Sequence, residues 1–91
     1  MAYRVQLLPK AARELSELPA AIQKRIIRWL DLLGENPRRP GTAKLKGRED
    51  LYRVHAGKDY VIIYTIRDDE VIVLVLRVGH RSEAYRRLPH Q

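Results

Sequence analysis

The segment LYRVHAGKDYVIIYTIRDDEVIVLVLRV, residues 51–78, consists of three runs of β-branched, aromatic and aliphatic residues separated by two short polar turns. Such runs are typical of β-strands, and turns this short join neighbouring antiparallel strands. The predicted strands are residues 51–56, 59–66 and 70–78, and the predicted turns are Gly57-Lys58-Asp59 and Arg67-Asp68-Asp69. The acidic cluster Asp68, Asp69 and Glu70 is interpreted as part of a solvated turn. The middle strand is β-branched or aromatic almost throughout, so we expect it at the centre of an antiparallel meander.

The first of these strands alternates between apolar and basic side chains. Tyr52, Val54 and Ala56 fall on one face, whereas Arg53 and His55 fall on the other, because successive side chains of a strand point to opposite faces of the sheet. We therefore expect one face of the sheet to pack against a core and the face with Arg53 and His55 to stay partly open.

The preceding residues predict one more strand and a helical hairpin. Residues 2–8 have the composition of a strand, and Pro9 suits the first turn of a helix over residues 10–18. Pro19 begins a second helix, which we expect Gly34 and Asn36-Pro37 to end. Its apolar residues recur at the spacing of one helical stripe: Ile22, Ile26, Trp29, Leu30 and Leu33.

Residues 37–50, PRRPGTAKLKGRED, are predicted to form an irregular basic loop, because they contain two prolines, two glycines and five basic residues. The sequence thus predicts an α+β fold in which an N-terminal strand and a helical hairpin precede a three-stranded antiparallel meander. The N-terminal strand completes a four-stranded sheet. We expect residues 1–91 to form a single domain, since 91 residues support one modest core.

The chain is strongly basic: 18 Lys and Arg residues outnumber 11 Asp and Glu residues, which gives a formal charge of +7. A field of this sign attracts polyanions such as nucleic acid, an acidic membrane surface or an acidic protein. The absence of cysteine excludes a disulfide framework, a cysteine nucleophile and a thiolate metal site. The longest apolar run, residues 71–76, is only strand-sized, so we expect a cytoplasmic protein without a membrane partner.

The sequence contains no GxGxxG, phosphate-loop or GxSxG motif. His55, His80 and His90 lack the spacing of metal ligands, so we expect no metal and no cofactor. What remains is a set of basic and aromatic side chains that we expect to converge on one patch: Lys44 and Lys46 in the basic loop, Arg53 and His55 on their strand, Arg77, His80 and Arg81 at the end of the last strand, and Tyr85 just beyond.

These residue types can cut RNA without a metal ion. The ribose 2′-hydroxyl attacks its adjacent phosphate when a base takes its proton and cations stabilise the phosphorane. Histidine exchanges protons near neutral pH, arginine binds two phosphate oxygens at once, and an aromatic ring stacks on an unpaired base. The competing interpretation is structural: Arg53 and His55 are then only the hydrated face of an amphipathic strand, and Tyr85 only caps the core.

Three stretches resemble the RelE/ParE toxin superfamily, namely KLKG (44–47), LYRVHAGKDYVIIYTI (51–66) and VLVLRVGHRSEAY (73–85). The VGHR…Y ending after a hydrophobic strand is the most specific of them, and the size, charge and element order fit as well. Resemblance to the RelE branch implies a fold like that of small microbial ribonucleases. It also implies the toxin of a type II toxin–antitoxin system that enters the ribosomal A site and cleaves mRNA by metal-free 2′-hydroxyl attack.

By position, the resemblance implies that Arg53, His55, Arg81 and Tyr85 belong to the active site, with Arg77 as a further cation. His55 is then the proton acceptor, or alternatively a cation that only binds phosphate; cation-rich surroundings favour the neutral acceptor. The arginines hold the scissile phosphate, Arg81 also assists the leaving oxygen, and Tyr85 stacks on a base. The residues implied to contact RNA or the ribosome are Lys44, Lys46, Arg48 and Lys58.

One position departs from the family's pattern. Val61 stands where many RelE relatives carry an arginine, which removes one cation that would stabilise the phosphate. We expect Arg77 to compensate for this loss, because many relatives have a smaller residue at its position.

The resemblance also implies partners. These are a cognate antitoxin protein with an acidic or amphipathic segment, the ribosome and mRNA, and operator DNA only through the antitoxin complex. Two other functions stay open: a ParE-like inhibitor of DNA gyrase without nuclease activity, and a non-enzymatic nucleic-acid-binding protein. A gyrase inhibitor has no need for the set of His55, Arg81 and Tyr85, and a binding protein would hold RNA without cutting it.

Overall fold

The computed structural model describes residues 2–86 and 88. Its elements are β1 (Arg4–Leu7), α1 (Pro9–Ser16), α2 (Ala20–Glu35), β2 (Thr42–Leu45), β3 (Arg48–His55), β4 (Tyr60–Arg67), β5 (Ile72–His80) and α3 (Arg81–Ala84). The strands form one sheet in the order β1-β5-β4-β3-β2, in which β1 runs parallel to β5 and the other pairs are antiparallel. The α+β class and the antiparallel meander with β4 at its centre are confirmed.

The sheet has five strands rather than the predicted four, because the expected loop over residues 37–50 contains β2 and the beginning of β3. The register between β2 and β3 shifts between Lys44 and Leu45, which marks a bulge. Gly47 follows with a φ of +81°, a conformation that glycine adopts without strain and that reverses the chain tightly. A short, bulged edge strand has little hydrophobic pattern of its own, so its prolines and glycines suggested a loop.

The two long helices follow the prediction closely, and Pro9 occupies the first turn of α1. α2 ends at Glu35 with Asn36 as its cap, as the predicted Asn36-Pro37 stop requires, but it continues through Gly34, which we also expected to end it. Gly34 is buried, and a Cβ there would lie 3.2 Å from both the Tyr3 carbonyl oxygen and the Val5 Cγ2. The Tyr3 N–H also donates to the Gly34 carbonyl oxygen at 2.6 Å. This glycine therefore allows β1 to approach α2 closely.

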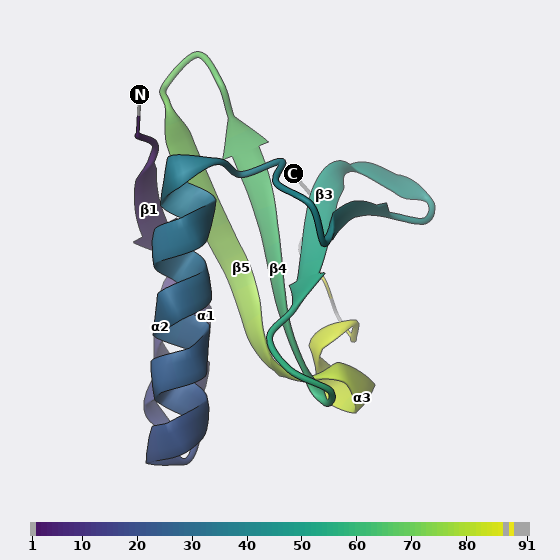
Figure 1. Cartoon of the computed structure of the whole chain (residues 1–91). Helices are drawn as coiled ribbons and strands as arrows, with labels where there is room; N and C mark the ends of the chain where they lie inside the picture. Colours follow the sequence, from purple (N-terminus) through teal and green to yellow (C-terminus); the bar gives the residue numbers. More distant parts are fainter. Residues whose placement is uncertain (1, 87, 89–91) are drawn as a thin grey trace.

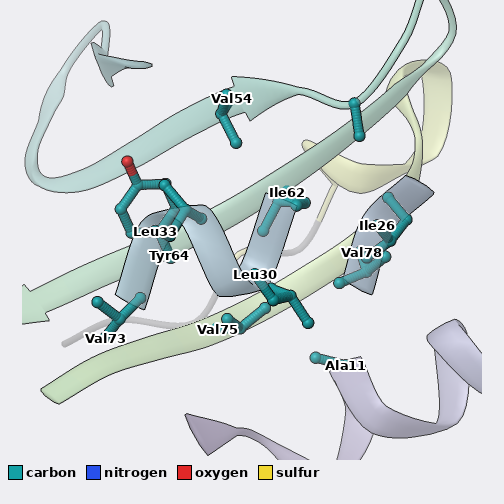
Figure 2. Close-up of a cluster of buried hydrophobic side chains, with 11 residues drawn as sticks. Ala11, Ile26, Leu30, Leu33, Val54, Ile62, Tyr64, Val73, Val75 and Val78 are labelled. Atoms are coloured by element: carbon teal, nitrogen blue, oxygen red, sulfur yellow. The ribbon is translucent and has the colours of Figure 1, made fainter. Parts of the chain in front are cut away.

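α1 and α2 lie together on one face of the sheet, which we call the helix-covered face (Figure 1). The apolar stripe of α2 faces the strands, and the larger core fills the space between them (Figure 2). Tyr64 is the largest fully buried side chain of this core, and its hydroxyl donates to the Pro37 carbonyl oxygen at 2.7 Å. The buried members of the core are Ala11, Ile26, Leu30, Leu33, Val54, Ala56, Ile62, Tyr64, Val73, Val75 and Val78.

The opposite side of the sheet, which we call the α3-covered face, has a smaller core. Its buried members are Leu51, Val61, Ile63, Leu76 and Ala84, and Leu88 packs against them. α3 is a single short helix beside β4 and β5 (Figure 1), and it leaves the neighbouring β3 residues Arg53 and His55 partly exposed. This face is therefore partly open, as the alternation of β3 predicted.

Candidate active site

Arg53 and His55 lie on the α3-covered face because they alternate with Val54, which belongs to the larger core. The strand register sets two rows of residues across this face: Arg53, Ile63 and Arg77 in one, and His55, Val61 and Gly79 in the next. Three of the predicted site residues are thus placed within two adjacent rows, with Ile63 and Val61 as the buried floor between them.

The end of the second row is open. A Cβ added at Gly79 would meet no heavy atom within 4 Å, so there is free space over this residue. Val61 lies beside it and is fully buried. Beyond Val61 is His55, two strands from Gly79, which separates their main chains by about 10 Å. A ribose-phosphate unit can therefore lie over Gly79, next to the buried Val61, with His55 beyond Val61 in the same row.

α3 begins at Arg81, two residues after Gly79. The Arg81 N–H donates to the Asp59 carbonyl oxygen at 2.8 Å, which fixes the start of α3 to the β3–β4 turn. The His80 side chain caps the helix, since its Nδ1 accepts from the Ser82 N–H at 3.1 Å. Arg81 is exposed, and Tyr85 at the end of α3 is 39% exposed, one of the most exposed large hydrophobic side chains described. Both are available to a ligand.

Arg77 differs from the other predicted site residues because it is only 7% exposed and already paired. Its Nε and Nη2 each lie 2.8 Å from the Glu14 Oε2, and its Nη1 donates to the Arg86 carbonyl oxygen at 2.5 Å. The other carboxylate oxygen of Glu14 accepts the Val78 N–H at 3.1 Å. β1 ends at Leu7 and pairs β5 only as far as Val75, so Glu14 takes the place of a strand at the exposed edge of β5.

The four residues expected to contact RNA do not share one face. Lys44 pairs with Tyr52, and its Nζ lies 6.0 Å from the centre of that ring, on the opposite side of the sheet from Arg53. Lys46 is exposed in the β2–β3 turn, and Arg48 forms an ion pair with Asp50 at 3.5 Å. Lys58 is exposed in the β3–β4 turn. It is the neighbour in sequence of Asp59, whose carbonyl oxygen accepts the Arg81 N–H at the start of α3.

Sequence reasoning missed two polar clusters. One is the ion pair of Glu14 with Arg77; nothing in the α1 pattern indicates a tertiary partner for Glu14. The other involves Asp68, which we expected to be simply solvated. Arg38 donates to both of its carboxylate oxygens, at 3.0 and 2.8 Å, and the Tyr3 hydroxyl donates to one of them at 2.7 Å. The hydrogen bonds from Arg38 and Tyr3 lower the pKa of Asp68 to about 2.

Among residues 2–86 and 88, no three His, Asp or Glu side chains gather as a metal-ion site would require. His90 lies outside the described residues. In the same part of the chain, no helix is both long and apolar enough to cross a membrane.

Comparison with known sequences gives one family and several relatives. Residues 5–85 match the family described as the ParE toxin of the type II toxin–antitoxin system parDE. Over 88 residues the chain is 31% identical to the mRNA interferase toxin RelE of Escherichia coli K12, covering 93% of this chain and 92% of that toxin. It is also 31% identical over 88 residues to toxin RelG of Mycobacterium tuberculosis, covering 96% of this chain and 100% of that toxin.

Solved structures agree with these relatives. The toxin of the archaeal RelE–RelB complex from Pyrococcus horikoshii superposes with a TM-score of 0.75 at 31% identity, covering 92% of this chain and 100% of that one. The isolated RelE toxin of E. coli gives a TM-score of 0.77 at 29% identity, with 90% and 89% coverage. An E. coli RelE variant with two arginines replaced by alanine, bound to a peptide of the antitoxin RelB, gives 0.77 at 28% identity, with 98% and 100% coverage.

Proposed function

The chain belongs to the RelE/ParE superfamily of toxins of type II toxin–antitoxin systems, and from this premise we propose that it is a ribosome-dependent endoribonuclease that cleaves mRNA. One observation carries the proposal. There is free space over Gly79, which shares a row of the sheet with the partly exposed His55 and lies two residues before the exposed Arg81. A proton acceptor and a phosphate-binding cation thus lie near a space that can hold the scissile phosphate.

The proposed reaction needs no metal ion. The 2′-oxygen forms a bond to phosphorus while the bond from phosphorus to the 5′-oxygen breaks, which leaves a 2′,3′-cyclic phosphate and a 5′-hydroxyl end. His55 takes the 2′-hydroxyl proton, and the 5′-oxygen receives a proton from water. Arg53 and Arg81 stabilise the charge that develops on the phosphate. Tyr85, exposed at the end of α3, stacks on a neighbouring base and orients it.

We assign Arg77 a supporting role rather than direct contact with phosphate. Its guanidinium already faces the Glu14 carboxylate and the Arg86 carbonyl oxygen. A cation whose charge is neutralised by a carboxylate at 2.8 Å has little attraction left for a second anion. Arg77 therefore holds the segment around α3, which carries Arg81 and Tyr85.

The proposed partners follow from the same role. A cognate antitoxin silences the toxin, as the RelE–RelB complexes among the similar structures suggest, and operator DNA is bound only through that complex. The ribosome and its mRNA are the target, which puts the working toxin in the cytoplasm. Co-purification with the product of a neighbouring gene tests the first point. A protein that is harmless when produced alone and binds no such product contradicts the toxin assignment.

Controlled production in cells followed by mapping of transcript ends tests the activity itself. We expect new 5′ ends inside translated reading frames. Arg81→Ala should reduce cleavage of ribosome-bound message by about a hundredfold or more, because it removes a cation that stabilises the transition state. Tyr85→Ala should reduce it too, through poorer positioning of the base. Arg13→Ala, which removes an exposed cation from α1, is the matched control.

A ParE-like inhibitor of DNA gyrase is the second candidate, because the matching family carries the ParE description. Transcript mapping in the same cells, together with a supercoiling assay on purified gyrase, distinguishes the two functions. Intact transcripts and loss of supercoiling would replace the assignment as a nuclease with that of a gyrase inhibitor. If Arg81→Ala and Tyr85→Ala cleave mRNA as well as the parent does, cleavage occurs elsewhere on the chain.

A further inference from the structure

The outer surface of α2 carries Lys24, Arg25 and Arg28, which we call the α2 stripe. With Ala21 they line a shallow hollow of about 220 Å³. All three cations are exposed, and positions three and four residues apart lie on one side of a helix, about 5.4 Å further along its axis per turn. The stripe therefore presents a row of positive charge to solvent on the side of the molecule opposite the α3-covered face.

In the described part of the chain, these charges have no ion-pair partner that would explain them. Within residues 2–86 and 88, none of the ion pairs involves a member of the α2 stripe. α2 has no acidic residue in its first turn and no basic residue in its last turn, although the helix dipole favours the reverse arrangement of charge. The stripe thus adds repulsion without a gain in helix stability, which suggests an external anionic ligand.

The α2 stripe reaches the active site through the β3–β4 turn. A Cβ added at Gly57 would stand 2.5 Å from the Arg25 Nη1, so the Arg25 side chain lies directly against this turn. Lys58 is the next residue and is exposed, and the Asp59 carbonyl oxygen accepts the Arg81 N–H. The lower part of α2, the turn and α3 lie at one end of the molecule (Figure 1). One turn thus connects the stripe with the site.

We propose that the α2 stripe is a second phosphate-binding surface, which holds the RNA backbone where it continues from the active site past Lys58. This inference rests on the proposed function, since it takes RNA as the ligand of the site. Phosphate backbone fits better than an acidic polypeptide. The stripe is a shallow row of cations that continues toward Lys58 and Arg81, whereas a protein partner is usually anchored by buried aromatic or aliphatic contacts.

Fluorescence anisotropy with 2′-O-methyl RNA tests the inference, because this RNA lacks the nucleophile and is bound whether or not the protein cuts. K24Q/R28Q is compared with R4Q/R13Q, which removes the same charge from exposed positions on β1 and α1. A 16-nucleotide RNA should bind K24Q/R28Q roughly tenfold more weakly than the parent, and its salt slope should fall by about 1.4, or 0.7 per lost phosphate contact. R4Q/R13Q should show neither change.

RNA length provides an internal control. A four-nucleotide RNA is too short to leave the active site, so the parent and both variants should bind it equally. Equal binding of the 16-nucleotide RNA to the parent and K24Q/R28Q would overturn the inference, and so would equal losses in both double variants. If K24Q/R28Q lost affinity only for a polyglutamate peptide, the inference would also be overturned, because the stripe would then bind an acidic protein. Cleavage of ribosome-bound message by the parent is measured separately, so the proposed function can fail independently.

A second set of binding measurements uses ribosomes that carry no message, and it shows which RNA supplies the bound backbone. Weaker binding of K24Q/R28Q both to the 16-nucleotide RNA and to these ribosomes identifies ribosomal RNA as a further source of the backbone. A loss restricted to the free 16-nucleotide RNA identifies the message itself. Unchanged binding of the 16-nucleotide RNA contradicts the inference whatever the ribosomes show.

Discussion

The helix-covered and α3-covered faces of the sheet differ in what they bury. Under α1 and α2, the core consists of aliphatic side chains and Tyr64, whose hydroxyl is satisfied by a main-chain carbonyl. Under α3, a few aliphatic side chains form a floor beside Arg53, His55 and the exposed Arg81. The difference indicates that one face supplies most of the stability and the other carries the site, so substitutions on the two faces should separate stability from cleavage.

The largest effect should come from the helix-covered face. Leu33 is fully buried in its core (Figure 2), so Leu33→Ala should lower the free energy of unfolding by about 2–5 kcal/mol. Urea denaturation measures this, with Ile27→Ala as the control, because Ile27 on the same helix is 47% exposed. The control should change stability by about 0.5 kcal/mol or less. Similar losses in both variants would mean that this face does not dominate stability.

The pair of Glu14 and Arg77 tests whether effects on stability and on cleavage can also be separated at the edge of β5. Arg77→Met and Glu14→Gln each leave one partner alone, so each should lose roughly 1–4 kcal/mol, and the double variant should lose less than the sum. A supporting Arg77 predicts that folded Arg77→Met retains cleavage within about tenfold of the parent. A loss of a hundredfold or more with the fold intact would return Arg77 to the cations that bind phosphate.

Val61 tests the comparison between the two faces from the α3-covered face, which carries the site. It is fully buried in the floor beneath α3, at the position where the resemblance to RelE implies an arginine. Val61→Arg should cost about 1–3 kcal/mol, because the longer side chain must displace α3 or bend away from it. Cleavage should fall as well, since α3 carries Arg81 and Tyr85. Val61→Ile is the control of similar shape. An arginine variant that keeps its melting temperature and cleaves faster would show that Val61 limits the site.

Much of the fold could be predicted from the sequence, because long runs with a clear period dominate it. The alternation over Tyr52, Arg53 and Val54 predicted the correct faces of β3, and the apolar residues of α2 predicted its buried side. β2 was missed because a four-residue edge strand with a bulge has too few apolar positions to set a pattern.

The site was harder to predict, because its grouping depends on register and tertiary partners. The side of the sheet that Lys44 occupies depends on its pairing with Tyr52, which no local signal reveals. The neutralisation of Arg77 depends on Glu14, 63 residues away in the chain. Residue type and spacing could therefore identify candidate cations, but they could not tell which of these cations are already paired within the protein.

The smallest effect should come from Asp68, which belongs to neither face of the sheet and so provides a baseline for both. Its pKa is lowered from 3.8 to about 2 by hydrogen bonds from Arg38 and Tyr3. A carboxylate with a depressed pKa in the folded state stabilises the fold above its ordinary value, and this contribution is lost as the pH falls from about 4 to about 2. Because the ion pair is exposed to solvent, the contribution is small.

Melting temperatures of the parent and Asp68→Asn should therefore converge between pH 5 and pH 2.5. The control Asp69→Asn should follow the parent, and mRNA cleavage at pH 7 should be the same in all three proteins. Parallel curves for the parent and Asp68→Asn would show that the contacts of Asp68 with Arg38 and Tyr3 do not stabilise the fold.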